Sequence, residues 1–195
     1  KGLGGFLVRN MESYGILDTM GLTSRIVLDA NIYTMNNRAE AFWMKKGILG
    51  DTVPLELNAK ELVHRNNKNS ELTVYGYTPM MVSVQCVQKT MDHCNHACVQ
   101  YVLKDRYQKE FRGVCSCEFC YNTIYNTLPT SLLKEKEKAE KLGVKAYRLS
   151  FTIETQQETE KIVRAFVDVY LRGQKPDGQM QTEETTKGHF QRGVE

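Results

Sequence analysis

The sequence predicts an α/β fold, a partial TIM-type (β/α) barrel of parallel strands with a cysteine-rich segment inserted after the fourth strand. Short apolar runs alternate with amphipathic stretches at a period of about 20 to 25 residues, which is typical of βα units. The apolar runs end in polar side chains, as buried parallel strands do. Four to five such units fit into 195 residues, roughly half of the about 250 residues of an eight-stranded barrel.

Five segments have the composition of buried strands. The run 5–10 is apolar until Arg9 and Asn10, and the run 25–29 repeats this design. Uninterrupted apolar runs indicate strands that are covered on both faces. The other expected strands begin near Thr52, Leu72 and Tyr147, with the spans 52–57, 72–75 and 147–153.

Amphipathic stretches between the strands predict helices. We expect the first helix to bury Tyr14, Ile16 and Leu17, and the second to bury Phe42 and Trp43. The expected helices cover residues 11–20, 39–46, 59–65, 132–142 and 155–171.

Helix-capping residues mark the ends of the later helices. Gly143 is a C-cap candidate, and Thr155 with Glu158 has the spacing of a capping box. Phe166 and Tyr170 lie on one side of the last helix, and we interpret them as core residues. The polar stretch 174–195 is expected to be a tail or an extended arm, which leaves 1–173 as the half-barrel domain.

Composition and charge exclude several classes of protein. With 41% hydrophobic and 25% charged residues the chain is globular, and a net charge of +3 does not by itself indicate nucleic-acid binding. No apolar run approaches the about 20 residues that span a bilayer, so we expect a cytoplasmic protein without a membrane partner. Because the chain begins at Lys1 rather than Met, we expect a fragment whose partner is the missing N-terminal half of the barrel, or otherwise a homodimer.

All six cysteines lie between Cys86 and Cys120, which favours a metal or iron–sulfur site over disulfides that staple distant loops. Cys117 and Cys120 form a CxxC pair, which together with Cys86 and Cys94 makes a four-thiolate constellation. Such a set suits either tetrahedral zinc or a [4Fe-4S] cluster. Cys98 and Cys115 are the alternate thiol ligands. Zinc would also accept the imidazoles of His93 and His96.

Polar residues at strand ends are candidates for catalysis, because a barrel keeps its site at the carboxyl ends of its strands. Asp29 and Glu56 have the alternative role of helix caps, and Arg148 that of a surface charge. The candidates are Arg9, Asp29, Glu56, Asn58, Arg148 and Glu154, with Asn10 and Asn31 beside them.

A group of basic residues with an aromatic neighbour lies beside the cysteines and makes RNA a candidate partner. The alternative is an exposed, solvated hairpin. These residues are Lys104, Arg106, Lys109 and Arg112, with Tyr107 among them.

Several blocks of the sequence are recognisable together. They are residues 71–83, with the sequence ELTVYGYTPMMVS, residues 103–106, with LKDR, residues 117–126, with CEFCYNTIYN, and residues 187–195, with KGHFQRGVE; residues 7–10 and 54–58 add to them. The chain resembles the collagenase-like peptidase family U-thirty-two over nearly its whole length. The resemblance implies the C-terminal half of a family barrel.

The family signature is matched at Glu71, Gly76 and Cys86, whereas Pro79 stands where the family has its first cysteine. The resemblance implies either a peptidase acting on collagen-like substrates or an iron–sulfur enzyme that hydroxylates RNA bases or quinone precursors without oxygen. It also favours [4Fe-4S] over zinc.

Residue chemistry favours the hydroxylation class over proteolysis. The sequence has neither HExxH nor GxSxG, and a metal whose positions are all filled by thiolates activates water poorly. We therefore expect an iron–sulfur hydroxylation enzyme acting on RNA or a small aromatic substrate. The alternatives are a collagenase-like peptidase and a non-catalytic scaffold that a metal stabilises.

Overall fold

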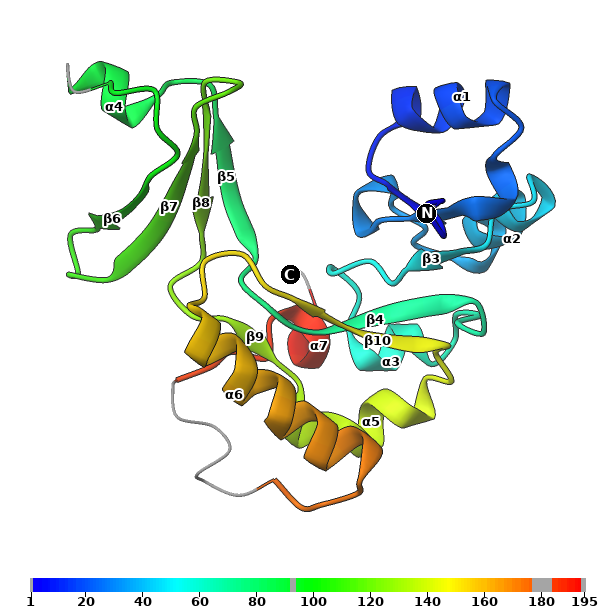
Figure 1. The fold of residues 1–195 in the computed structure, drawn as a ribbon. Coiled ribbons are helices and arrows are strands. Elements are labelled where there is room, and N and C mark those ends of the chain that lie inside the picture. Colours follow the sequence, from blue (N-terminus) through cyan, green and yellow to red (C-terminus); the bar gives the residue numbers. More distant parts are fainter. Residues whose placement is uncertain (1, 92–93, 177–183, 194–195) are drawn as a thin grey trace. The chain divides into compact units, whose positions relative to one another are not determined.

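A computed structural model describes residues 2–91, 94–176 and 184–193 (Figure 1). The chain divides into two compact units, which are described separately. The first unit holds Lys1–Val74, Leu132–Leu149 and Lys187–Glu195, and the second holds Tyr75–Ser131 and Ser150–Thr186.

A curled parallel sheet forms a half-barrel in the first unit and confirms the predicted α/β class. Its strands are β1 (Phe6–Val8), β2 (Ile26–Leu28), β3 (Gly50–Thr52), β4 (Ser70–Gly76) and β10 (Ala146–Ser150), in the order β1-β2-β3-β4-β10. The first four strands pair in parallel. The expected strand over 52–57 is wrong in extent: β3 ends at Thr52, and Asn58 caps the helix that follows.

Short helices connect these strands, and asparagines begin three of them. Asn10, Asn36 and Asn58 each accept backbone N–H groups at a helix start. The α-helices are α1 (Met11–Thr19), α2 (Asn37–Lys45), α3 (Ala59–Leu62), α5 (Lys136–Lys141) and α7 (His189–Arg192). Single 3-10 turns are η1 (Thr23–Arg25), η2 (Ala30–Ile32) and η3 (Leu133–Glu135).

Two apolar residues expected in the core of the first unit are exposed instead. Tyr14 and Leu17 are buried against Trp43, whereas Ile16 is 63% exposed and Phe42 is 54% exposed. Residues three apart share a helix face, but adjacent residues point about 100° apart. One short helix can therefore bury only one of each adjacent pair.

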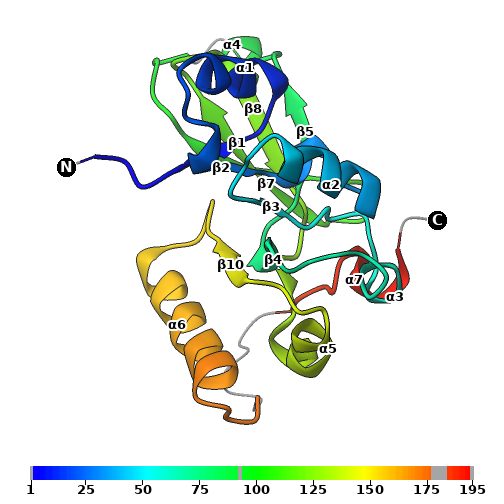
Figure 2. The ribbon, with the colours of Figure 1, turned by 90° about the vertical axis from the view of Figure 1, so that its right-hand side faces the viewer.

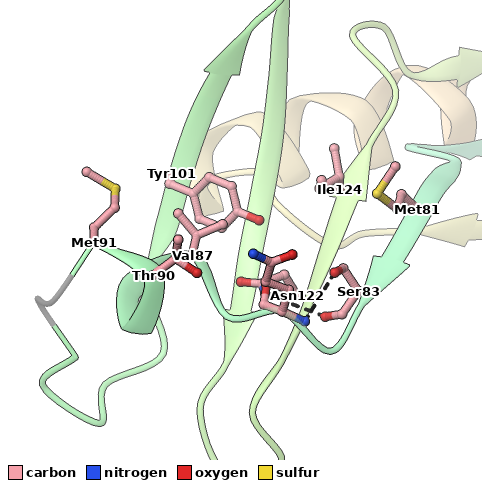
Figure 3. Close-up of a pocket in the computed structure, with 9 residues that line it drawn as sticks. Met81, Ser83, Val87, Thr90, Met91, Tyr101, Asn122 and Ile124 are labelled. Atoms are coloured by element: carbon pink, nitrogen blue, oxygen red, sulfur yellow. Dashed lines mark hydrogen bonds between the residues drawn. The ribbon is translucent and has the colours of Figure 1, made fainter.

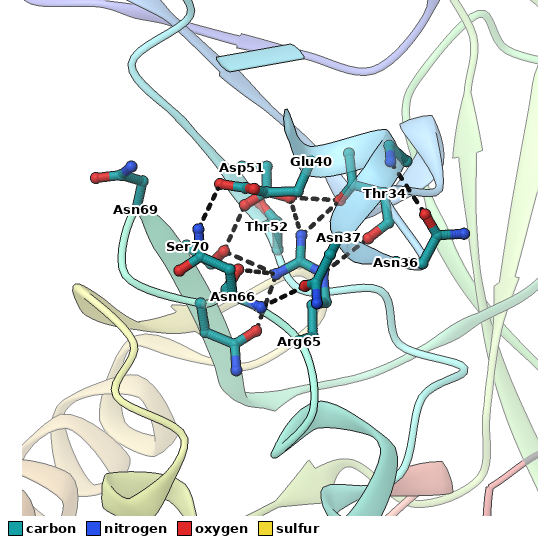
Figure 4. A network of polar contacts seen from close by, with 12 residues as sticks. Thr34, Asn36, Asn37, Glu40, Asp51, Thr52, Arg65, Asn66, Asn69 and Ser70 are labelled. Carbon is teal, nitrogen blue, oxygen red and sulfur yellow. Dashed lines mark hydrogen bonds and ion pairs between the residues drawn. The ribbon is translucent and has the colours of Figure 1, made fainter. Parts of the chain in front are cut away.

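The first unit also buries an ion pair, which the sequence analysis did not predict (Figure 4). Asp51 on β3 pairs with Arg65, and the side chains are 1% and 2% exposed. Arg65 also donates to the carbonyl of Thr34 at 2.8 Å and to Ser70 Oγ at 2.9 Å. Ser70 Oγ in turn donates to Asp51 at 2.5 Å, so each charged group has several partners.

The second unit contains a four-stranded antiparallel sheet that includes most of the cysteine segment. Its strands are β5 (Pro79–Ser83), β6 (Gln100–Lys104), β7 (Glu110–Ser116) and β8 (Tyr121–Tyr125), in the order β5-β8-β7-β6. The short helix α4 (Val87–Thr90) follows β5. Asp105 Oδ1 accepts the N–H groups of Tyr107 and Lys109 and closes the hairpin between β6 and β7, while Gln108 adopts a left-handed φ of 61°.

Helix α6 (Gln156–Phe166) follows β10 and continues as the π-helical turn η4 (Val167–Leu171) (Figure 2). Thr155 and Glu158 form the predicted capping box, and their hydrogen bonds lower the pKa of the Glu158 carboxyl. Phe166 is buried against Tyr75, which confirms its place in the core.

Two contacts hold the described residues near the end of the chain. The strand β9 (Thr130–Ser131) pairs with β4, and Thr186 bridges to Thr130. Lys187 forms an ion pair with Glu135 in the first unit. Of the expected tail 174–195, residues 177–183 and 194–195 lie outside the described part of the chain.

Candidate functional site

Three cysteines come together in the second unit, although the longest separation along the chain is 31 residues. Cys86 is the N-cap of α4 and Cys115 lies on β7, with their sulfurs 3.5 Å apart. The sulfurs of Cys115 and Cys117 are 3.8 Å apart, and the Cys117 thiol contacts the carbonyl of Ala97 at 2.9 Å. Cys86 and Cys115 are buried, so this part of the group is shielded from water.

The surroundings of Cys86 and Cys115 move their pKa values in opposite directions. Backbone donation from Lys89, followed by the hydrogen bond from Cys115, lowers the pKa of the Cys86 thiol. Burial, together with the hydrogen bonds to its neighbours, raises the pKa of Cys115 to about 12. The surroundings therefore favour the thiolate form more at Cys86 than at Cys115, and thiolates are the form that binds metals.

The other cysteines lie at the exposed rim of this group. Cys94, Cys98 and Cys120 are exposed. The pKa of Cys117 is raised by burial first, and then by the charges of neighbours that include Cys94 and Cys98. Cys120 Sγ lies 3.7 Å from the carbonyl of Cys117, within the turn that the CxxC spacing predicts.

The thiols are suitable metal ligands, but the described residues do not form a complete metal site. All six cysteines are free thiols, a donor set that suits zinc or iron–sulfur clusters. Within the described ranges, no group of three or more His, Cys, Asp or Glu side chains is arranged to hold one metal ion. His93 lies outside the described residues. The two sulfur separations match the about 3.8 Å edge of a zinc tetrahedron with bonds of about 2.3 Å.

A second polar group lies at the strand ends of the first unit. Arg148 on β10 donates to Asp29 Oδ1 at 2.8 Å and to Thr52 Oγ1 at 2.9 Å, and it also pairs with Glu71. Arg9 pairs with Asp29 at 3.0 Å and is 62% exposed. Arg148 is 19% exposed, so its interpretation as a surface charge is wrong.

Glu71 and Thr52 belong to this polar group but are not among the candidates expected from the sequence. The two residues are paired in the register of β3 and β4, and Thr52 donates to Glu71 at 2.9 Å. Thr52 is the last residue of β3, so its place at a strand end was the signal that could have identified it. We call Arg9, Asp29, Thr52, Glu71 and Arg148 the strand-end group.

Three other candidates lie elsewhere. Asn58 caps α3 through Lys60 and Glu61, and Glu56 is half-buried just before it. Glu154 accepts the N–H of Thr152 at 2.7 Å and that of Ile153 at 3.0 Å, within the second unit.

The basic residues of the hairpin are exposed and partly neutralised. Lys104 pairs with Glu110 across the strands at 3.0 Å, and Arg106 stacks on Tyr107 at 4.7 Å from the ring centre. Lys109 is exposed, whereas Arg112 on β7 is half-buried and acts electrostatically on Glu158. The hairpin therefore presents a weaker positive surface than its sequence indicates.

In the described part of the chain, no helix combines the length and apolar character needed to cross a membrane. Comparison with known proteins found no matching family model, no matching curated protein and no matching solved structure.

Proposed function

We propose that this chain is an iron–sulfur protein of the collagenase-like peptidase type that its sequence resembles, acting in oxygen-independent hydroxylation of RNA bases or a small aromatic substrate. In this proposal the half-barrel is part of a TIM-type barrel, and the four-stranded sheet is an insertion after β4. The observation that carries the proposal is the gathering of free thiols around Cys86, Cys115 and Cys117, with the pKa of Cys86 lowered by its surroundings.

The proposed cluster ligands are Cys86, Cys94, Cys117 and Cys120, with Cys98 and Cys115 as alternates. A bound [4Fe-4S] cluster supplies one-electron redox chemistry. Cys86 is prepared for ligation because its backbone and thiol donors already favour the thiolate. Cys115 is buried beside it and keeps its proton, which suits a hydrogen-bond donor to a ligand sulfur.

The strand-end group is the proposed substrate-binding element of the half-barrel. Arg148 is fixed by two carboxylates and a hydroxyl, which sets the direction of its guanidinium. Arg9 shares Asp29 and is exposed enough to meet a polar substrate group. A prearranged array of this kind orients a substrate without reorganising during the reaction.

The test is deletion of the gene, followed by mass spectrometry of modified nucleosides and of quinone intermediates. We expect one hydroxylated product to disappear, wild-type protein to restore it, and Cys117→Ser to fail. Ser116→Ala, at the neighbouring position of the same segment, is the matched control and should restore it. If neither pool changes and the purified protein cleaves gelatin without a cluster, the peptidase alternative replaces this proposal.

A structural zinc site is the second candidate function of the thiols. The sulfur separations of 3.5 and 3.8 Å favour it, because a cubane cluster holds its thiolates farther apart than one ion does. In that case the metal folds the four-stranded sheet and takes no part in redox chemistry. Protein holding one zinc per chain, with a deletion strain that has normal nucleosides and quinones, would support this candidate.

A further inference from the structure

The unpaired polar atoms around the cavity of the second unit are too enclosed to contact a ligand. This cavity of about 240 Å³ lies between α4 and the four-stranded sheet (Figure 3). Its wall includes Tyr101 and Asn122, whose hydroxyl and Oδ1 atoms have no hydrogen-bond partner among the described residues. Both atoms are shut off from the cavity, so a molecule inside it does not reach them. An exposed side chain with free donors is the stronger candidate, and Arg9 in the first unit is one, since its side chain is 62% exposed.

Arg9 is exposed but is held in place by residues at the carboxyl ends of two strands. Arg9 follows β1 directly, Asp29 follows β2, and Asn31 lies in the turn η2. The Arg9 Nε lies 3.0 Å from Asp29 Oδ2, and Nε and Nη2 both donate to Asn31 Oδ1, at 3.3 and 3.2 Å. Asp29 is fixed in turn, because its Oδ1 accepts from Arg148 at 2.8 Å and from the N–H of Ala30 at 3.0 Å. A ligand therefore does not have to immobilise the Arg9 side chain when it binds.

These contacts occupy one edge of the Arg9 guanidinium and leave another edge free. A guanidinium carries five N–H donors in one plane, so Nε and Nη2 form one edge and Nη1 and Nη2 form another. Asp29 and Asn31 occupy the first edge. In the part of the chain that the structure describes, Nη1 of Arg9 has no hydrogen-bond partner. Two parallel N–H groups on the free edge match two oxygens of a carboxylate or of a phosphate group.

The second arginine of the strand-end group has the opposite arrangement. Both terminal nitrogens of Arg148 have protein partners, since Nη1 pairs with Asp29 and Nη2 contacts Thr52 and Glu71. Arg148 therefore positions Asp29, whereas Arg9 presents donors to solvent. The two guanidiniums are balanced by the carboxylates of Asp29 and Glu71, so the group attracts anions only weakly from a distance. Recognition at Arg9 must then depend on direct hydrogen bonds to its free edge.

We propose that the free edge of Arg9 binds one oxyanion group of the substrate, a carboxylate or a phosphate. The place of Arg9 in the fold supports this, because parallel α/β sheets bind their ligands beyond the carboxyl ends of the strands. The bound oxyanion accepts two N–H groups from the fixed guanidinium, and its other oxygens stay in solvent. This rests on the proposed function, in which the strand-end group binds the substrate, and it adds the kind of charged group that the substrate carries.

The test is fluorine NMR on the full chain with three probes of similar shape. They are para-fluorobenzoate, para-fluorophenyl phosphate and the neutral para-fluorobenzamide. We expect saturable binding of an anionic probe, about tenfold tighter than that of the amide, because hydrogen bonds to a charged acceptor are the stronger ones. The tighter of the two anions identifies the carboxylate or the phosphate as the natural group. Equal affinity of all three probes, or no binding of either anion, would overturn the proposal.

Three variants locate the binding. Arg9→Met should abolish the preference for the anionic probes. Arg25→Met is the matched control, because Arg25 is exposed and precedes β2, at the opposite end of the parallel sheet, and it should leave the affinities unchanged. Arg9→Lys keeps the charge without the fork and should lose most of the preference. Equal losses in Arg9→Met and Arg25→Met, or wild-type affinity in Arg9→Lys, would overturn the assignment to the free edge.

The iron content of the same samples separates this inference from the proposed function. Protein that holds the iron–sulfur cluster but does not distinguish the probes would overturn the Arg9 site and leave the cluster. Protein without iron that still binds an anion through Arg9 would support the site and overturn the cluster.

Discussion

Replacing Arg65 by methionine should strongly destabilise the first unit. Methionine retains most of the volume but none of the donors, so Asp51, at 1% exposure, loses its ion-pair partner. Breaking a buried ion pair from one side typically costs about 3–5 kcal/mol. Arg65 also donates to Thr34, Asn67 and Ser70, which supports the upper part of that range.

The assay is urea unfolding followed by circular dichroism, with the metal content of all variants matched. Arg38→Met is the control, because Arg38 is exposed, and it should change the free energy of unfolding by less than about 0.5 kcal/mol. Adding Asp51→Asn to Arg65→Met should cost less than the sum of the single changes, since the two residues are in contact. A cost below about 1 kcal/mol for Arg65→Met would refute the reasoning.

Three further predictions concern the sites. Arg148→Lys keeps the charge but loses the forked guanidinium that pairs with two carboxylates. Thermal unfolding should show that the free energy of unfolding falls by about 1–3 kcal/mol. Wild-type stability would contradict these contacts. If zinc takes the alternate ligand Cys115, its affinity should rise with pH, because the pKa of Cys115 is raised to about 12 and ligation must displace the proton of this thiol. Chelator competition measures the pH dependence, and a flat profile excludes Cys115 as a ligand. Burial acts to raise the pKa of Glu135, but Lys138 and Lys187 outweigh it and lower the pKa. Glu135→Gln should therefore reduce the free energy of unfolding at neutral pH, and this cost should disappear as pH falls through the lowered pKa. An equal cost at every pH would contradict the ion pairs.

The parallel strands could be predicted because burial on both faces gives short apolar runs. The runs that contain Val8, Ile26 and Leu28 end where the structure ends their strands. The ion pair of Asp51 and Arg65 escaped prediction for the opposite reason. Polar residues are expected at the surface, and only the tertiary structure reveals that these two are enclosed.

The candidate sites were predictable in composition but not in geometry. Sequence spacing marks the cysteines as a group, but the position of Cys115 beside Cys86 depends on how α4 meets β7. Arg148 and Asp29 are 119 positions apart, and β10 and β2 are not neighbouring strands, so the pairing depends on how the sheet curls. Long-range register of this kind is set by tertiary packing, which no local pattern contains.

The proposed iron–sulfur cluster is tested most directly by the iron and acid-labile sulfide content of anaerobically purified protein. We predict about four iron and four sulfide per chain, retained in Cys98→Ser and lost in Cys86→Ser and Cys117→Ser. Colourless protein holding one zinc per chain, or metal-free protein with paired sulfurs, would contradict it.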